Sequence, residues 1–465
     1  MSTNRTTTTR IIPVAVAGAL GAVGLGAAAH AAEPTPQDLM AQIQDLQAKV
    51  QQMEANQQAA TTTTTTTTAA AAAPTGEAAT VDSVLRDAER RSQLLQDNGG
   101  LTGGHEKGKF FLRSADNNFY LNPNAQLQLR YVANFREEAA DLDGDGNVID
   151  TDDDQLDDGF EIRRAKIALD GHAWSPDLTF KIQWEAAQNG GDVTLEDAWV
   201  RYAFDDEWAV RAGQYKDNVF HEETVSSKRQ LAVDRTLVNE LLAGGMTDYV
   251  QGIALLYDPG NQFRGEFGVH DGANSDNTDF TDEGADWGFS ARGEYALSGD
   301  GISKAYDDFT AMGNTDDLFV VGGGFDLSQA GDVDAWLHTV DVQWENTNGL
   351  ALYGAFIGSW IDSDVADGYN WGIVAQVGYM LNHNWEAFGR VDWTSLDEEF
   401  VAAGLEDELL ELTVGANYYI EGHAAKFTMD LTYLPDGSPS DEEGIGILAT
   451  EEAEFVFRGQ FQLLL

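Results

Sequence analysis

Strict alternation of apolar and polar residues is the feature that most constrains this chain. From Leu178 to Glu185 the sequence reads LTFKIQWE, with a large apolar side chain at every second position. Successive side chains of a β-strand point to opposite faces, so this strand has one apolar and one polar face. It belongs either to a soluble sheet that covers a core or to a membrane barrel with lipid outside and a wet lumen inside.

Fifteen further segments of this kind accompany the first one, and together they predict an all-β fold. The sixteen predicted strands are 124–135, 159–172, 177–186, 191–204, 207–214, 248–257, 262–271, 285–296, 317–327, 334–346, 348–360, 368–381, 383–394, 408–420, 423–434 and 452–465. A tilted membrane strand needs about 9–11 residues, which most of these segments provide. A final strand that runs to the last residue suits a closed barrel, because closure pairs the last strand with the first. The alternative is a soluble sandwich or propeller, although the fixed repeat of a propeller is missing.

The composition excludes some partners and some chemistry. The 465 residues include 78 acidic and 27 basic side chains, a formal net charge of −51, and no cysteine. Such a surface repels nucleic acid, and the absence of cysteine removes disulfides and thiolate metal sites. After the N-terminus, no apolar run is long enough for a membrane helix, so a membrane role has to come from strands.

The N-terminal region begins with the pattern of a secretory signal peptide at residues 1–31. Arg5 and Arg10 precede an apolar run of small residues, which ends in the cleavage motif Ala29-His30-Ala31. A membrane anchor is the alternative, but the run is rich in alanine and glycine and only weakly hydrophobic. We therefore expect export from the cytoplasm.

Four further segments follow the signal peptide. Residues 32–58 predict a short coiled coil, because Leu39, Ile43, Leu46, Val50 and Met53 follow a heptad seam. An amphipathic helix packed on its own chain is the alternative reading. Residues 59–80 form a Thr/Ala-rich linker, residues 81–108 predict a short helix with a Gly-rich connection, and residues 109–465 form the predicted barrel.

A series of motifs between Gly159 and Glu240 carries a family resemblance. GFEIRRAKIALDG, FKIQWE, LEDAWVRY, RAGQYK and ETVSSKRQLAVDRTLVNE follow one another in this order. The series resembles the phosphate-selective porin family, also called the porin O/P family. The resemblance implies a sixteen-stranded antiparallel transmembrane barrel in the bacterial outer membrane, a homotrimer, and a third loop folded into the lumen. It also implies a water-filled channel for the passive diffusion of small hydrophilic solutes, including anions such as phosphate.

Ten basic residues are predicted to line the pore. If the apolar side chains face lipid, the alternate positions face the lumen, and the long connection 215–247 adds further cations. The ten residues are Arg130, Arg164, Lys166, Lys181, Arg201, Arg211, Lys216, Lys228, Arg229 and Arg235. Guanidinium groups can bind phosphate bidentately, so these cations could form an anion path. Acidic residues such as Glu185, Asp197 and Asp234 lie among them, however, and the charges could instead pair with one another.

The same connection contains a second pattern, which predicts a narrowed pore. Leucines follow one another at Leu231, Leu237, Leu241 and Leu242. They suggest a short helix that packs inside the barrel mouth.

An acidic stretch before the second predicted strand matches a calcium-binding loop. The predicted ligands are Asp141, Asp143, Asp145, Asn147 and Asp152. Oxygen atoms at alternate positions suit a hard cation such as Ca²⁺, although Asp152 stands where a longer glutamate is usual. The alternative is a solvated acidic tract. The predicted channel itself requires no cofactor.

No motif of a known enzyme class stands out, so we expect a channel and not an enzyme. GxSxG, HExxH and P-loop patterns are absent from the sequence. The main rival function is a secreted, calcium-binding all-β surface or adhesion protein, which would be soluble without detergent. A barrel hydrolase is a weaker rival. The expected partners are outer-membrane lipid, further copies of the chain and small hydrophilic solutes or anions, with the N-terminal segment in the periplasm.

Overall fold

The computed structural model describes most of the chain from residue 100 to residue 465. Gaps in this description fall at residues 107, 143–147, 187–190, 244–247, 274, 280, 282–286, 299–300, 303, 332, 365 and 402–404. For residues 137–142, 148–155, 304–305 and 330 only the backbone is described. The predicted signal peptide, coiled coil, linker and second helix lie outside the described residues.

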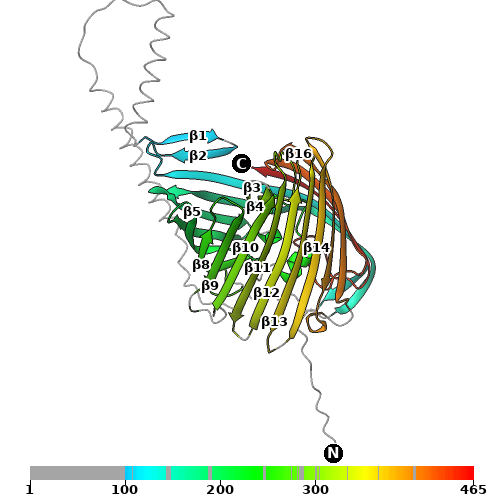
Figure 1. Cartoon of the computed structure of the whole chain (residues 1–465). Coiled ribbons are helices and arrows are strands. Elements are labelled where there is room, and N and C mark those ends of the chain that lie inside the picture. Colours follow the sequence, from blue (N-terminus) through cyan, green and yellow to red (C-terminus); the bar gives the residue numbers. More distant parts are fainter. Residues whose placement is uncertain are drawn as a thin grey trace, which may run out of the picture. The chain divides into compact units, whose positions relative to one another are not determined.

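Sixteen antiparallel strands of the described chain form a closed barrel (Figure 1). They are β3 (Tyr120–Leu142), β4 (Val148–Ala173), β5 (Ser175–Ala186), β6 (Val193–Ala203), β7 (Trp208–Lys216), β8 (Tyr249–Tyr257), β9 (Phe263–His270), β10 (Trp287–Ser298), β11 (Leu318–Ala330), β12 (Val333–Glu345), β13 (Leu350–Asp362), β14 (Asp367–Met380), β15 (Trp385–Ser395), β16 (Glu408–Glu421), β17 (Ala425–Leu434) and β18 (Glu454–Leu464). Each strand pairs with the next, and β18 pairs with β3 from Glu454↔Arg136 to Leu464↔Gln126. Every one of the sixteen predicted segments corresponds to one of these strands.

The exposure of the wall side chains alternates along each strand. In β12, Trp336 and Val340 point outward and are 47% and 61% exposed, whereas Leu337 and Thr339 point inward and are buried. An exposed apolar face around the whole wall would be unstable in water, and it matches a hydrocarbon environment. The soluble sandwich is therefore wrong for this chain. Within the described residues, no helix is long and apolar enough to cross a membrane.

A hairpin that the strand pattern did not predict precedes the barrel. It consists of β1 (Thr102–Glu106) and β2 (Lys109–Arg113), and β2 joins the sheet through Leu112↔Leu121. The sequence around Gly103 and Gly104 suggested a connection, because glycine is depleted in strands. The two strands nevertheless pair along their whole length.

The two ends of the barrel receive different connections. The chain terminus is hydrogen-bonded to the start of the wall, since Ala125 N–H donates to Leu465 O (3.0 Å) and Leu465 N–H donates to Ala125 O (2.9 Å). We call this end the terminal rim and the other end the far rim. Because neighbouring strands are antiparallel, the long connections 217–248 and 435–453 start at the far rim, whereas 299–317 starts at the terminal rim.

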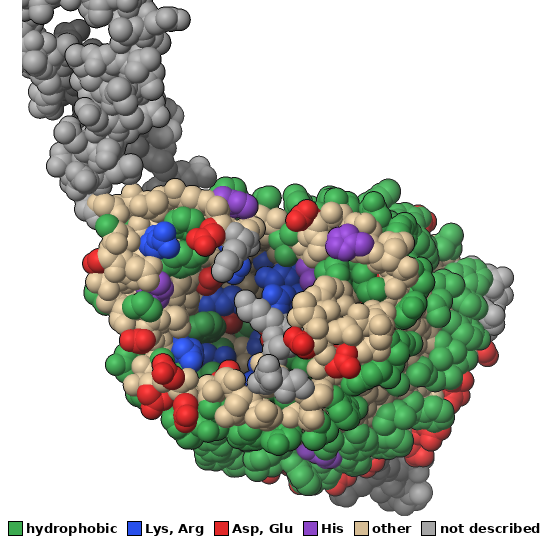
Figure 2. Space-filling view, turned by 45° about the horizontal axis from the view of Figure 1, so that its top comes forward, with side chains coloured by type: hydrophobic (Ala, Val, Ile, Leu, Met, Phe, Trp, Pro, Cys, Tyr) green, Lys and Arg blue, Asp and Glu red, His purple; other side chains and the backbone are tan. Residues whose placement is uncertain are grey.

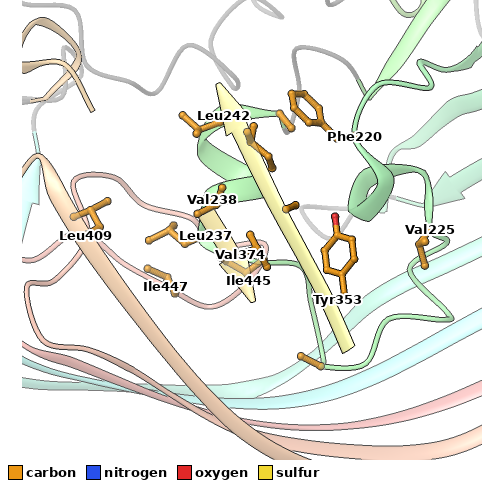
Figure 3. Packing of buried hydrophobic residues seen from close by; sticks show 14 of the residues in the cluster. Phe220, Val225, Leu237, Val238, Leu242, Tyr353, Val374, Leu409, Ile445 and Ile447 are labelled. Carbon is orange, nitrogen blue, oxygen red and sulfur yellow. The ribbon is translucent and has the colours of Figure 1, made fainter. Parts of the chain in front are cut away.

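The main hydrophobic core of the described chain lies inside the barrel. Residues of the 217–248 connection pack against inward side chains of the wall and against the 435–453 connection (Figure 3). Its labelled members are Phe220, Val225, Leu237, Val238 and Leu242 from the first connection, Tyr353, Val374 and Leu409 from the wall, and Ile445 and Ile447 from the second. The long connections therefore occupy part of the lumen.

Candidate functional site: the lumen and its constriction

Residues 217–243, the constriction segment, enter the lumen between β7 and β8. The segment contains two short helices, α3 (His221–Thr224) and α4 (Leu237–Leu242). Thr236 caps α4, and its side chain accepts a hydrogen bond from Asn239 N–H (3.1 Å). The predicted helix in the barrel mouth is thus present, and Leu237 and Leu242 bury its apolar side.

Wall side chains hold the backbone of the constriction segment. Inward polar residues of β16 and β17 provide the partners. The bonds run from Val233 N–H to Asp430 Oδ2 (2.9 Å), from Leu237 N–H to Glu411 Oε2 (2.8 Å), and from Lys426 Nζ to Gln230 O (2.9 Å). Since these partners are buried, each bond is sheltered from competing water. The segment is therefore fixed against one side of the wall.

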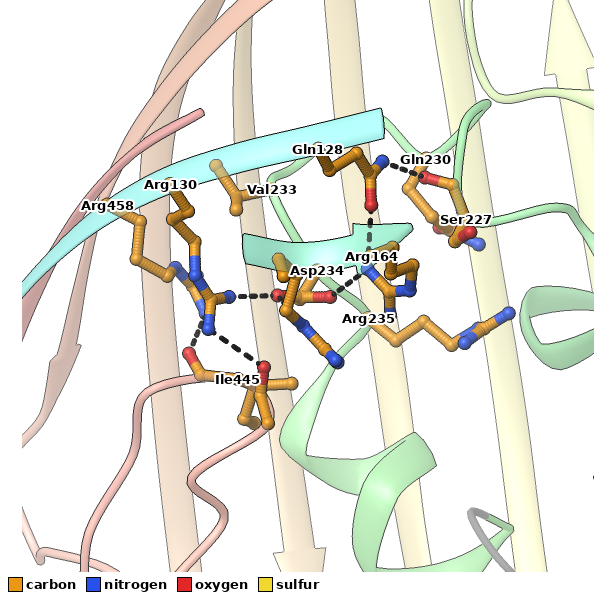
Figure 4. A network of polar contacts seen from close by, with 12 residues as sticks. Gln128, Arg130, Arg164, Ser227, Gln230, Val233, Asp234, Arg235, Ile445 and Arg458 are labelled. Carbon is orange, nitrogen blue, oxygen red and sulfur yellow. Dashed lines mark hydrogen bonds and ion pairs between the residues drawn. The ribbon is translucent and has the colours of Figure 1, made fainter. Parts of the chain in front are cut away.

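Asp234 joins the same segment to the nearby strands β3 and β4 of the wall. Its carboxylate pairs with Arg130 on β3 and with Arg164 (3.0 Å) and Arg163 (3.3 Å) on β4 (Figure 4). Burial alone would raise the pKa of Asp234, but the three guanidinium groups hold it well below its usual range. Arg130 and Arg164 are buried and engaged. They fasten the constriction segment and are not free to meet a solute.

Most of the other predicted pore cations also have acidic partners. Arg235 is buried beside Glu223 (3.3 Å) and donates to backbone carbonyls. The remaining pairs are Lys166 with Glu185 (2.9 Å) and Glu196, Lys181 with Asp197 (2.7 Å), Arg211 with Glu266, Lys216 with Glu223 and Asp248, and Arg229 with Asp307 (3.3 Å). Paired charges explain much of the lining.

Two predicted cations, Arg201 and Lys228, have no ion pair within the part of the chain that the structure describes. Arg201 lies directly opposite Arg211 in the β6–β7 register. Arg211 turns to Glu266 and stacks on the Tyr215 ring at 4.0 Å, which leaves Arg201 without compensation. Like charges directly opposite each other destabilise a sheet unless something lies between them.

Lys228 lies on the constriction segment and has three further cations near it. Burial lowers its pKa, and Lys181, Arg229 and Lys109 lower it further, to about 8. Arg201 is a diagonal neighbour of Lys181, because Lys181 pairs with Trp199 and Thr179 pairs with Arg201. We call Lys109, Lys181, Arg201, Lys228 and Arg229 the basic cluster. Figure 2 shows a hollow at one end of the barrel with Lys and Arg side chains inside it and an apolar outer wall.

Comparisons with known proteins agree with this architecture. Residues 135–335 match the family model described as "Phosphate-selective porin O and P". The chain is an outer-membrane β-barrel porin, and this part of it is similar to that family. Porins are channels, and the expectation that the protein is not an enzyme is confirmed.

Solved structures of other porins share the fold. The porin is 14% identical to "Salmonella typhi OmpF complex with Daunomycin", with a TM-score of 0.50 over 74% of this chain and 98% of that one. It is 12% identical to "Anion-selective porin from Comamonas acidovorans", with a TM-score of 0.50 over 74% of this chain and 99% of that one. An "Uncharacterized protein" of Aquifex aeolicus (strain VF5) is 22% identical over 281 residues, which span 56% of this chain and 67% of the relative.

Several inward cations of the porin were not among the predicted pore residues. Arg163 reaches the lumen because a bulge between Gln128 and Leu129 shifts the β3–β4 register. The others are Arg136, Arg264, Arg292, Arg390, Lys426 and Arg458. Five of these six lie in later strands, where the same alternation marks inward positions and could have identified them. The bulge, in contrast, leaves no clear signal in the sequence.

The predicted calcium loop lies at the tip of the β3–β4 hairpin of the porin. Asp143, Asp145 and Asn147 lie outside the described residues. The backbone of Asp141 pairs with Asp150 and that of Asp152 pairs with Ala139. Calcium binding there stays a prediction.

Proposed function

We propose that this porin is an anion channel that passes small hydrophilic anions, including inorganic phosphate, by passive diffusion. The observation that supports this proposal best is the pair of unpaired cations, Arg201 and Lys228, in a lumen where most other cations have acidic partners. A mobile anion can supply the missing partner. No bond chemistry is required of the protein.

The chemistry of the basic cluster suits phosphate in particular. A guanidinium group offers two parallel N–H donors to a phosphate, and an ammonium adds a compact charge. Lys228 is partly exposed, and its lowered pKa reflects repulsion by neighbouring cations in addition to burial. An anion that enters the cluster relieves this repulsion. Binding that is shared among several weak sites also allows the anion to leave.

The reversal potential of the purified porin in a planar bilayer under a KCl gradient tests the proposal. We expect the sign of the reversal potential to show that chloride permeates better than potassium. Inorganic phosphate added to the bath should reduce the chloride current. The double variant R201Q/K228Q should lose most of this preference and the phosphate block. R113Q is a control for the loss of a cation elsewhere, because Arg113 lies on β2 and does not belong to the basic cluster. Cation-selective current in the unmodified porin would refute the anion channel.

A further inference from the structure

A cluster of potential metal ligands lies at the base of the constriction segment. Asp217, His270 and Asp326 each offer one ligand atom, and these atoms all lie within 4.8 Å of one another. The three side chains are 2%, 3% and 0% exposed. None of them belongs to the basic cluster, and the proposed anion channel does not use them.

Three separate elements bring these residues together. Asp217 directly follows β7, where its N–H donates to Asp248 O (3.2 Å) and the constriction segment begins. His270 is the last residue of β9, and Asp326 lies on β11. Strands β7, β9 and β11 all run from the terminal rim to the far rim, and the three residues lie in or just after the second half of their strands. A ligand that bound all three would tie the base of the constriction segment to the wall.

The polar atoms that face this point lack partners. Asp217 Oδ2, Asp326 Oδ2 and both ring nitrogens of His270 accept or donate no hydrogen bond within the described chain. His270 Nε2 lies 2.9 Å from Asp326 Oδ2, although the two groups are not aligned for a hydrogen bond. Buried carboxylate oxygens without hydrogen bonds are costly, and the two carboxylates here also repel each other. A bound cation would remove both costs.

The surroundings are shaped to hold the imidazole in place. His270 lies opposite Gly288, and a Cβ atom on Gly288 would lie 2.1 Å from His270 Cε1 and 2.4 Å from Nδ1. Only glycine leaves room for the ring at this position. On the other side, Ser328 Oγ donates to Asp326 Oδ1 (2.6 Å) and orients that carboxylate. Side chains that bind a metal are commonly held in place by hydrogen bonds and packing contacts of this kind.

We propose that Asp217, His270 and Asp326 bind a divalent transition-metal ion, with Zn²⁺ the best match. One imidazole and two carboxylates suit Zn²⁺, which accepts nitrogen and oxygen ligands and often keeps water as a fourth ligand. Ligand atoms about 2.0–2.2 Å from a tetrahedral zinc lie about 3.4 Å apart, so atoms that now lie within 4.8 Å of one another would have to approach by about 1.4 Å at most. The ion would neutralise the buried charge and fix the base of the constriction segment.

A proton is the competing occupant of the cluster. An imidazolium at His270 between two carboxylates would also reduce the repulsion, without any metal. The two occupants can be distinguished in the purified protein. At constant pH, added zinc changes the stability of the protein only if the cluster binds a metal.

Metal titration of the full-length porin in detergent tests the proposal. The protein is treated with EDTA, dialysed, and titrated with Zn²⁺ in a calorimeter at constant pH. We expect one tight site per chain and a higher unfolding temperature when zinc is bound, since a ligand that binds only the folded state stabilises it. D217N and H270Q should lose the site. H423Q is the control, because His423 is half-buried and also lies beside a carboxylate, Asp308 (3.3 Å).

Cobalt keeps the test decisive if a variant fails to fold. Co²⁺ in an enclosed site with a nitrogen ligand and low coordination number gives strong visible absorption, whereas Co²⁺ on exposed acidic groups gives the weak absorption of the hydrated ion. We expect the strong spectrum in the unmodified porin, and zinc should displace it. The proposal is overturned if the unmodified protein binds no zinc or shows only the weak cobalt spectrum. It is also overturned if the unmodified protein, D217N, H270Q and H423Q all bind zinc equally.

Discussion

Single charged side chains in the lumen fall into two groups, those with an ion-pair partner and those without one in the described chain. Arg130 and Arg164 are buried against Asp234 and hold the constriction segment in place. Arg201 and Lys228 have no such partner in the described chain, which is why the proposed anion path depends on them. The distinction depends on distances between segments far apart in the sequence, and it separates the predicted pore residues that hold the fold together from those that the proposed anion path uses.

The anion preference of the channel should weaken as the pH rises through about 8. Below this pH, Lys228 carries a positive charge, and above it the side chain becomes neutral, since its pKa is lowered to about 8. We therefore expect the reversal potential under a KCl gradient to decrease between pH 7 and pH 9. K228R should remove this step, because arginine stays charged throughout the range. An unchanged step in K228R would mean that another group controls it.

Replacing Asp234 should loosen the constriction segment. D234N keeps the shape of the side chain but leaves Arg164 buried without a negative partner and Arg130 with Glu161 alone. Removal of one member of a buried ion pair costs about 3–5 kcal/mol. We expect a lower unfolding temperature in detergent, and single channels with larger and noisier currents.

A matched control separates this effect from a general loss of acidic charge. Asp316 is exposed and lies on the 299–317 connection, so D316N changes the same charge with no buried partner. It should leave the unfolding temperature unchanged. Equal effects of D234N and D316N would contradict a fastening role for Asp234.

Alternation of side chains predicts which way a residue faces but not what it touches. The inward direction of Arg130 and Lys181 follows from the period-two pattern. Their partners, Asp234 on a long connection and Asp197 on the next strand, depend on how the connection folds back and on the register between β5 and β6. For this reason the sequence alone could not decide between an anion path and a lining of paired charges.

Among the secondary elements, α4 depends on a close approach to the wall. Gly372 on β14 faces this helix, and a Cβ atom there would lie 2.7 Å from Val238 Cγ1 and 3.0 Å from Trp393 O. The wall uses glycine at this point because a larger residue would displace the helix. The close packing therefore makes α4 sensitive to a single methyl group.

The variant G372A should push α4 away from the wall. Overpacking of this kind costs about 1–3 kcal/mol, and it should expose the preceding residues to protease. We expect trypsin to cleave at Lys228 or Arg229 faster in G372A than in the unmodified porin. G354A is the control, because Gly354 points to the outer face and a Cβ there would meet nothing closer than Val374 O at 3.6 Å. Equal cleavage in both variants would show that α4 tolerates the methyl group.

The elements themselves were predictable to different degrees. The sixteen wall strands alternate strictly, because each one separates lipid from the lumen, and the pattern identifies all of them. The hairpin β1–β2 carries Gly103 and Gly104 and covers no continuous core, so it gives little periodic signal. The connections 299–317 and 435–453 are buried by contacts distant in sequence, which no local pattern reports.

For the whole molecule, the outer surface and the lumen impose opposite requirements on one wall. Most outward side chains are apolar and exposed, and most inward ones are polar and buried, with an apolar group that packs against the connections. Closure of β18 on β3 leaves no edge strand, so the backbone of the wall is satisfied without water. Further association therefore has to use the outer face or the N-terminal region.

We predict that the porin assembles as a homotrimer and that the wall, more than the N-terminal coil, holds it together. The heptad seam within residues 32–58 is short, and isolated helices of this length are marginal in water. Deletion of residues 32–98 behind an intact signal peptide should leave the native mass in detergent at three chains, with dissociation at a lower temperature. The variant I43N/V50N, which interrupts only the seam, should behave like the deletion, because polar residues at seam positions weaken a coiled coil. Monomers in both proteins would instead assign the assembly to the coil, and monomers in the unmodified porin would refute the trimer.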